Sequence, residues 1–253
     1  MQGKTVFITG AARGIGLSMA QAFTEQGANV VITDKNEQLL KEAVENNPSL
    51  MAYTCDVTDE EAIREAIEWT IDRFKTLDIL INNAGFQHVS LIEDFKTEVF
   101  EDMQKVMVVA PFIAMKYVLP HMKKNQFGRI INMASINGVI GFAGKAGYNA
   151  AKHGVIGLTK VAALEVAKDG ITVNAICPGY VDTELVRHQF KDLAKTRGIQ
   201  VEEVLEEVLY PLVPQKRLLD VSEVTGFALY LASDLAKGLT GQAILLDGGY
   251  TAQ

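Results

Sequence analysis

A tyrosine and a lysine four residues apart, Tyr148 and Lys152, are the side chains in this sequence best placed to do acid–base chemistry. They stand where a helix is expected to begin, and this spacing puts both on one helix face. A free tyrosine, whose pKa is about 10, is a poor acid and base at neutral pH, but an ammonium group close by would lower that pKa. Ser135 follows an apolar run and could hydrogen-bond a carbonyl oxygen as that oxygen gains charge. Together the three residues predict proton transfer at an alcohol or a carbonyl group.

A glycine-rich turn, residues 9–16, comes directly after the first apolar run and opens a helix. Gly10 would permit a tight turn, and the helix N-terminus would offer free N–H groups to a pyrophosphate. Asp34 follows about twenty residues later, where an acceptor for a ribose 2′-hydroxyl is expected. A carboxylate there would repel a 2′-phosphate, which favours NAD(H) over NADP(H). Arg13 and Lys35 keep NADP(H) open, because both could lie close to such a phosphate.

Two further segments lie at the expected carboxyl ends of strands, where open α/β sheets bind ligands. Asp56 and Val57 could hydrogen-bond and flank an adenine. Asn83 belongs to the run 82–85, whose small residues would let the backbone approach a ribose. Ordinary turn chemistry is an equally good interpretation of either segment.

The elements that would position these residues alternate along the chain as short apolar runs and longer segments of helical period. The predicted strands are 5–9, 29–33, 50–54, 79–82, 129–134, 172–176 and 243–246. The predicted helices lie near 14–26, 37–46, 59–74, 97–123, 147–168 and 221–233. Strands this rich in Val and Ile are buried on both faces, so the pattern predicts an α/β fold of Rossmann type. We expect a doubly wound, parallel, seven-stranded sheet with helices on both faces.

No repeat, low-complexity tract or linker divides the chain, so residues 1–253 are interpreted as a single dinucleotide-binding catalytic domain. One insertion, from about 183 to 216, breaks the alternation and is polar, charged and helical in character. Its place after the carboxyl end of the sixth strand favours a helical substrate lid. A surface helical hairpin without function is the alternative.

Composition and charge argue against several classes of partner. The formal net charge of −7 gives no electrostatic reason to expect nucleic acid or an anionic membrane. No cleavable signal and no apolar run near the length of a membrane span is expected. Cys55 and Cys177 are expected to be buried free thiols in a reducing compartment rather than a disulfide or a metal site. We therefore predict a cytoplasmic protein without a metal site.

In order along the chain, the turn 9–16, the Asn-Asn-Ala-Gly run 82–85, Ser135, the Tyr-x-x-x-Lys pair and Pro178-Gly179 resemble the short-chain dehydrogenase/reductase family. The resemblance covers essentially the whole chain. It implies NAD-dependent hydride transfer at a secondary alcohol, and it implies a homotetramer. It also implies that Lys152 binds the nicotinamide ribose and that 178–183 lines the nicotinamide. The implied cofactor-binding residues are Gly10, Arg13, Ile15, Asp34, Asp56, Val57, Asn83, Tyr148, Lys152, Val181 and Thr183.

Within that family the sequence is most similar to bacterial D-3-hydroxybutyrate dehydrogenases, along the runs 82–89, 144–148, 176–179 and 246–253. In those enzymes a small carboxylate is held by a Gln after the Asn-Asn-Ala-Gly run, a Lys before the Tyr, and a Gln in the lid. Charge-assisted hydrogen bonds suit a short hydroxy acid, which has little apolar surface. The implied substrate-binding residues are Gln87, Ser135, Asn137, Lys145, Tyr148 and Gln189.

Some positions depart from the pattern of the relatives that the sequence resembles. Met107 stands where many family members carry an Asn that supports a water relay to the lysine, and a thioether is a weak acceptor and no donor. Asn137 replaces a His of the hydroxybutyrate enzymes, and Tyr180 and Tyr250 stand at their Trp positions. We therefore expect turnover to be present but reduced.

Three functions stay open at this stage. The first is interconversion of D-3-hydroxybutyrate and acetoacetate with NAD(H), a reaction of ketone body metabolism. The second is reduction of a 3-oxoacyl thioester, usually with NADP(H), or oxidation of another polyol or hydroxy acid. Asp34 and the acidic insertion argue against the thioester. The third is a dinucleotide-binding protein with little catalysis, which only Met107 favours.

Overall fold

The computed structural model describes residues 1–184, 186–187, 190, 194 and 200–252. Their strands form one parallel sheet of seven strands in the order β3-β2-β1-β4-β5-β6-β7. The strands are β1 Thr5–Thr9, β2 Asn29–Asp34, β3 Leu50–Thr54, β4 Ile79–Asn82, β5 Gly128–Met133, β6 Ile171–Pro178 and β7 Ala243–Leu246. The predicted fold class is confirmed, and every predicted strand is present with ends shifted by two residues at most.

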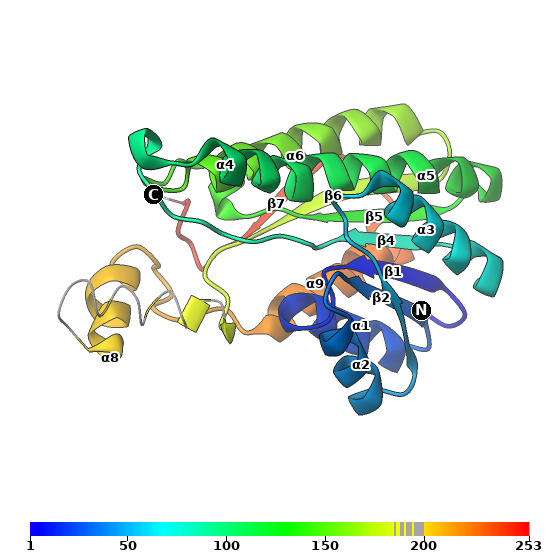
Figure 1. Cartoon of the computed structure of the whole chain (residues 1–253), viewed down its shortest axis with the longest axis horizontal. Helices are drawn as coiled ribbons and strands as arrows, with labels where there is room; N and C mark the ends of the chain where they lie inside the picture. The colour runs from blue at the N-terminus through cyan, green and yellow to red at the C-terminus, as the bar shows by residue number, and fades with distance from the viewer. Residues whose placement is uncertain (185, 188–189, 191–193, 195–199, 253) are drawn as a thin grey trace.

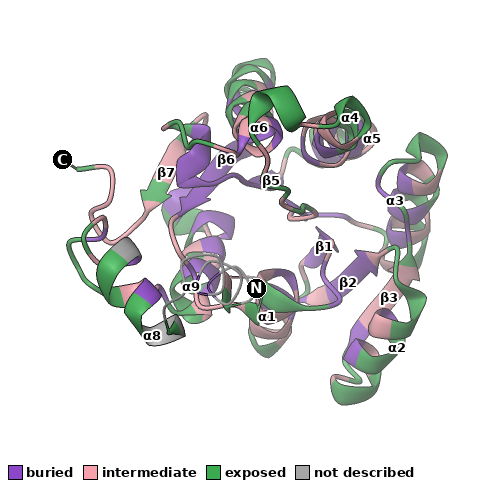
Figure 2. Cartoon of the chain, turned by 60° about the vertical axis from the view of Figure 1, so that its left-hand side comes forward, coloured by how far each residue is buried: buried purple, intermediate pink, exposed green. Residues whose placement is uncertain are grey.

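Helices cover both faces of the sheet (Figure 1). They are α1 Gly14–Glu25, α2 Glu37–Asn46, α3 Glu60–Phe74, α4 Thr97–Gln104, α5 Ala110–Asn125, α6 Ala146–Val166, α8 Val201–Val204 and α9 Val221–Ala232. Alternate strand residues enter two cores: Ile8 and Val30 pack with α1, α2 and α9, whereas Phe7 and Val31 pack with α3, α5 and α6. Figure 2 shows the central strands as the most buried part of the molecule. Burial on both faces explains why their sequences do not alternate between polar and apolar residues.

The strand order reverses between β1 and β4, which are direct neighbours in the sheet. Their carboxyl ends therefore lie together, and each leads into one of the predicted ligand loops, the glycine turn 9–16 and the run 82–85. Ligands of open α/β sheets bind at such a reversal of strand order. The topology alone thus brings two segments of the predicted site to one place.

The predicted helix 97–123 is interrupted by a π-helical turn, Lys105–Val109, between α4 and α5. In this turn the N–H of Ala110 donates to the carbonyl of Lys105, five residues earlier, whereas in an α-helix the acceptor lies four residues earlier. Pro111 gives the physical reason, because it has no N–H to donate to the carbonyl of Met107 four residues earlier. The apolar period alone does not show this change of winding.

The stretch Thr97–Asn125 is long and apolar enough, by length and composition alone, to cross a membrane. An 18-residue window of this stretch has a mean hydropathy of 1.2, and 44% of the window is buried inside the protein. The expectation that no apolar run reaches span length is therefore wrong. The buried side of α5 packs into the core beneath α3, and Lys116 on its other side pairs with Glu60 at 2.8 Å. This packing accounts for part of its apolar character, and exposed side chains such as Phe112 lie outside it.

The described part of the insertion 183–216 has its own small apolar cluster, separate from the two sheet cores. It contains α8 and a second π-helical turn, Leu205–Leu209. Tyr180 and Tyr250 border the cluster, with ring centroids 6.2 Å apart. In Figure 1, α8 stands apart from the layers of the sheet. An appended helical unit agrees with the predicted lid, whose function stays a prediction.

Candidate active site

Lys152 is held from behind by the strand that ends next to it. The residue lies in the second turn of α6, and its Nζ donates to the carbonyl of Met133, at the end of β5, across 2.6 Å. Burial lowers the pKa of Lys152 to about 8, and the neighbouring Cys177 works in the opposite direction. An ammonium has three N–H donors, so those not used by Met133 can serve a ligand. The lysine is therefore both fixed in place and available.

Tyr148 lies next to Lys152, whose Nζ is 5.4 Å from the centre of the phenol ring. Burial raises the pKa of Tyr148 to about 12, while its hydrogen bond with Ser135 lowers it. Burial therefore sets the direction of the shift, which is opposite to the lowering that the sequence predicts from the ammonium. At neutral pH Tyr148 is therefore a proton donor.

Ser135 caps a short 3-10 helix, Ile136–Gly138, directly after β5. Its Oγ accepts from the backbone N–H of Asn137 at 3.2 Å, and it is hydrogen-bonded to Tyr148 as well. The structure thus brings Ser135, Tyr148 and Lys152 together as the sequence predicts. A carbonyl oxygen that reaches Ser135 and Tyr148 would meet two hydroxyl groups.

Lys145 is a buried cation at the start of α6, three residues before Tyr148. Its Nζ lies 4.4 Å from the centre of the Phe142 ring, and burial lowers the pKa of Lys145 to about 8. Among the described residues no carboxylate forms an ion pair with it. A buried cation without an anionic partner is costly, and a small anionic ligand would relieve that cost.

The other predicted substrate contacts differ in what the structure says of them. Asn137 is buried, and its Oδ1 has no hydrogen-bond partner among the described residues. Gln87 is half-buried on the loop after β4. This loop is tied to the start of α6 by an isolated bridge between Ser90 and Lys145. Gln189 lies outside the described residues, so its predicted role is not examined by the structure.

The glycine turn forms a cradle that a dinucleotide fits. Gly10 has a positive φ of 59°, and a Cβ there would come within 2.7 Å of the Cα of Ala84. Arg13 occupies the N-cap of α1, and no side chain caps that helix end. The first N–H groups of α1 are therefore available to a pyrophosphate, and Ile15 lies half-buried beside them.

Asn83, the residue directly after β4, braces this cradle. Its Nδ2 donates to the carbonyl of Gly10 at 2.8 Å and to that of Thr9 at 3.0 Å. The hydroxyl of Thr9 in turn accepts from the backbone N–H of Asn83 at 3.0 Å. The side chain and the backbone N–H of Asn83 therefore both hold the turn, and its predicted contact with a ribose stays a prediction.

The acidic residues at the other strand ends keep accepting capacity. Asp34 ends β2, and its Oδ1 accepts from the N–H of Asn36 at 3.0 Å. Asp56 accepts from the backbone and hydroxyl of Thr58, and these bonds lower the pKa of Asp56. Both are thus anchored by turn contacts, and Val57 beside them is buried.

The segment predicted to line a nicotinamide leaves the sheet at the end of β6. Val181 is buried and forms an isolated bridge with Leu219, and the N–H of Asp182 donates to the carbonyl of Leu219 at 2.8 Å. Thr183 follows, with its Oγ1 accepting from the N–H of Val186. These contacts hold the start of the insertion at the carboxyl edge of the sheet.

Met107 lies in the π-helical turn, and its side chain and that of Lys152 both come close to Gly85. A Cβ added to Gly85 would lie 3.3 Å from Met107 Sδ and 3.8 Å from Lys152 Nζ. The side chain is buried in an apolar cluster with Met103, Ala151 and part of Tyr148. The π-helical turn was missed at the sequence level, although Pro111 within the predicted helix was the available signal.

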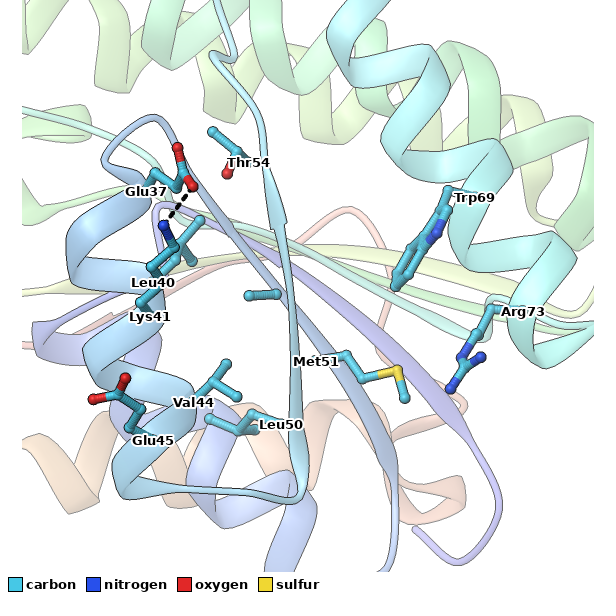
Figure 3. Close-up of a pocket in the computed structure, with 11 residues that line it drawn as sticks. Glu37, Leu40, Lys41, Val44, Glu45, Leu50, Met51, Thr54, Trp69 and Arg73 are labelled. Carbon is cyan, nitrogen blue, oxygen red and sulfur yellow. Dashed lines mark ion pairs between the residues drawn. The ribbon is translucent and has the colours of Figure 1, made fainter.

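A hollow of about 550 Å³ lies over the edge strand β3, between α2 and α3. Figure 3 shows Leu40 and Lys41 of α2 on one side of it and Trp69 of α3 on the other. None of the predicted catalytic, cofactor or substrate residues lines it. The chemistry belongs to the carboxyl edge of the sheet and not to this hollow.

Comparisons with known proteins agree with this geometry. Residues 10–251 match a family model described as enoyl-(acyl carrier protein) reductase. The chain is 55% identical over 257 residues to the uncharacterized oxidoreductase YxjF of Bacillus subtilis, with 100% of both covered. It is 43% identical over 256 residues to the D-beta-hydroxybutyrate dehydrogenase of Rhizobium meliloti, with 99% of both covered. A crystal structure of an actinorhodin polyketide ketoreductase variant with NADPH superposes with a TM-score of 0.94 at 31% identity, covering 99% of this chain and 98% of that one.

The fold, the glycine cradle and the Ser135, Tyr148 and Lys152 cluster define an oxidoreductase that uses a nicotinamide dinucleotide. The chain belongs to the short-chain dehydrogenase/reductase family. It is similar over its full length to D-beta-hydroxybutyrate dehydrogenases, and it acts as an enzyme on a secondary alcohol or ketone.

Proposed function

We propose that this protein interconverts D-3-hydroxybutyrate and acetoacetate with NAD(H). The observation that carries the proposal is the buried ammonium of Lys145, three residues before Tyr148, which forms no ion pair with any residue that the structure describes. If the substrate carboxylate binds Lys145, the 3-hydroxyl group of the same small molecule would be left to reach Tyr148. The similarity to two D-beta-hydroxybutyrate dehydrogenases supports the same substrate.

The residues of this chain supply binding and proton transfer. The bound dinucleotide supplies the hydride chemistry at its nicotinamide. In ketone reduction, Tyr148 Oη gives its proton to the oxygen of the substrate, and Ser135 Oγ stabilises that oxygen as its charge grows. In alcohol oxidation the Tyr148 phenolate would take the hydroxyl proton and become the phenol, and its raised pKa makes this phenolate scarce at neutral pH. Lys152 keeps a positive charge beside the phenol in both directions.

Asp34 supports the choice of NAD(H). Its carboxylate ends β2, where it would accept from a ribose 2′-hydroxyl and repel a 2′-phosphate. Lys35 is exposed beside it, and its charge contributes to the lowered pKa of Asp56. Lys35 is thus directed in part toward a carboxylate of this chain. Asp34→Ala should reduce kcat/KM for NAD more than for NADP.

A 3-oxoacyl thioester is the second candidate, and the description of the matched family model as enoyl-(acyl carrier protein) reductase favours it. The acyl end of a thioester is uncharged and would leave Lys145 without an anion. The two candidates therefore differ in whether Lys145 is needed for turnover.

The test compares wild type with Lys145→Met on D-3-hydroxybutyrate, its methyl ester and a 3-oxoacyl thioester. Loss of a charge-assisted hydrogen bond of about 1.5–3 kcal/mol should lower kcat/KM for the acid by about 10- to 100-fold. The methyl ester should lose little. Lys105→Met, on an exposed lysine, is the control. Turnover of thioester but not of acid by the wild type would overturn the proposal.

We also propose a homotetramer in the cytoplasm that binds neither nucleic acid nor membranes. Apolar side chains exposed on the outer side of α5 and α6 support the assembly: Phe112, Val161 and Leu164. The two helices are in contact, and exposed apolar side chains on neighbouring helices are typical of protein interfaces.

A further inference from the structure

A chain of polar side chains crosses the apolar interior directly behind the active site. Asn82 Nδ2 donates to Asn132 Oδ1 at 2.8 Å, and Asn132 Nδ2 donates to Thr159 Oγ1 at 2.9 Å. The Thr159 hydroxyl donates to the carbonyl of Val155 at 2.7 Å. The relative exposures of Asn82, Asn132 and Thr159 are 5%, 0% and 0%. These hydrogen bonds therefore join β4, β5 and α6 in the interior of the protein.

The place of each member in the fold links it to a site residue. Asn82 and Asn132 are partners in the register of β4 and β5. Asn132 precedes by one residue Met133, whose carbonyl holds Lys152, and Ser135 follows soon after. Thr159 lies seven residues after Lys152, about two turns along the same face of α6. The hydrogen bonds thus fix how α6 is rotated and shifted against β5.

Fully apolar side chains would fill this space at lower cost, because buried polar groups contribute little to stability unless every partner is present. The polar chain instead specifies one alignment of three elements. A shift of α6 along β5 would break the Asn132 to Thr159 bond and move Lys152 away from the carbonyl of Met133. A misplacement of catalytic groups by about 1 Å can reduce turnover by about 100-fold.

We infer that Asn132 and Thr159 are positioning residues, which set the alignment of Lys152 and Tyr148 with Ser135 through a buried hydrogen bond between β5 and α6. Neither residue touches the reacting atoms. The inference rests on the assignment of these three residues as the proton-transfer site, and it does not depend on which alcohol is the substrate.

The chain contains a matched control in α3. Thr70 is also 0% exposed, and its hydroxyl also donates to the carbonyl four residues earlier, Ala66, at 2.7 Å. The difference is that Thr159 additionally accepts from Asn132. Thr159→Val and Thr70→Val therefore remove the same local bond, and only Thr159→Val breaks the link between β5 and α6. Thr159→Ser keeps the hydroxyl and removes a methyl group.

The experiment measures kcat and KM with any alcohol that the wild type oxidises, the Kd for NADH by fluorescence, and Tm. We expect kcat to fall at least tenfold and the Kd for NADH to rise severalfold in Thr159→Val. Thr70→Val should change both by less than twofold. Thr159→Ser should restore kcat to within about threefold of wild type.

Two results would overturn the inference. One is a Thr159→Val enzyme whose kcat and Kd match those of Thr70→Val, whatever its Tm. The other is a Thr159→Ser enzyme no more active than Thr159→Val, which would mean that packing and not the hydrogen bond matters. Failure of D-3-hydroxybutyrate as a substrate would count against the proposed function alone, because the NADH measurement needs no substrate.

Discussion

Two lysines carry the electrostatics of the site at the level of single residues. Lys145 and Lys152 are both buried, and burial lowers the pKa of each to about 8. Each lysine is thus charged at neutral pH, and its burial in the charged form lowers the stability of the fold. Buried groups with shifted pKa values of this kind are typical of functional sites. The sequence predicted both residues, but it could not predict the pKa values, which depend on burial.

The lowered lysine pKa values predict the pH dependence of both activity and stability. The kcat/KM for a hydroxy acid should fall as pH rises through 8, because Lys145 loses the charge that binds the carboxylate. Stability should move the other way between pH 8 and 9. The unfolded lysines keep their protons up to a pKa of about 10.4, so the unfolded state binds more protons in this range and a higher pH favours the folded state.

Urea unfolding at pH 8 and pH 9 measures the predicted rise in stability with pH. Lys145→Met should reduce the rise in the free energy of unfolding between these two pH values and should be more stable than wild type at pH 7. The same rise in wild type and variant would mean that Lys145 is not desolvated as the structure indicates.

Met107 carries a second prediction at this scale. Met107→Asn would add a hydrogen-bonding side chain next to Lys152, and we expect a higher kcat together with a lower Tm, because the amide enters an apolar cluster. Met103→Asn is the control, since Met103 is buried in the same cluster but faces Gly147. An unchanged or lower kcat in Met107→Asn would show that no proton path to Lys152 is missing.

At the level of elements, most of the architecture was predictable from the sequence. Residues 79–81 form a continuous apolar run in β4, and helices such as α3 begin with a capping Asp59. The π-helical turn at Lys105–Val109 was not predictable from the apolar period, which continues through it. The hydrogen bond from Asn83 to Gly10 was not predictable either, because it joins segments far apart in sequence.

The glycine cradle yields a prediction of its own. Gly10→Ala should abolish measurable NADH binding and lower Tm, because a Cβ at this positive φ would come within 2.7 Å of the Ala84 backbone. Gly238→Ala, in a loop where an added Cβ meets nothing within 4 Å, is the control. Calorimetric titration with NADH decides: normal binding by Gly10→Ala would mean that the turn can move away from Ala84.

For the whole molecule, the outer side of α5 and α6 makes the proposed assembly testable. Leu164 is 82% exposed there, and burying such a side chain in an interface contributes about 1.5–3 kcal/mol. Leu164→Arg should therefore dissociate the tetramer, as measured by light scattering after size exclusion. Ile92→Arg, at an 80% exposed position before α4, should leave it intact. A wild type that is monomeric would contradict the proposed assembly outright.

The central claim is that Tyr148 transfers the hydroxyl proton of D-3-hydroxybutyrate while NAD accepts the hydride. The most direct measurement is the initial rate of NADH formation from this acid, for wild type and for Tyr148→Phe. We predict steady NADH formation by wild type and a loss of about 10²–10⁴-fold in the variant, with NADH affinity within a few-fold of wild type. Equal rates in the two proteins, or no NADH from wild type that binds the cofactor normally, would contradict the account.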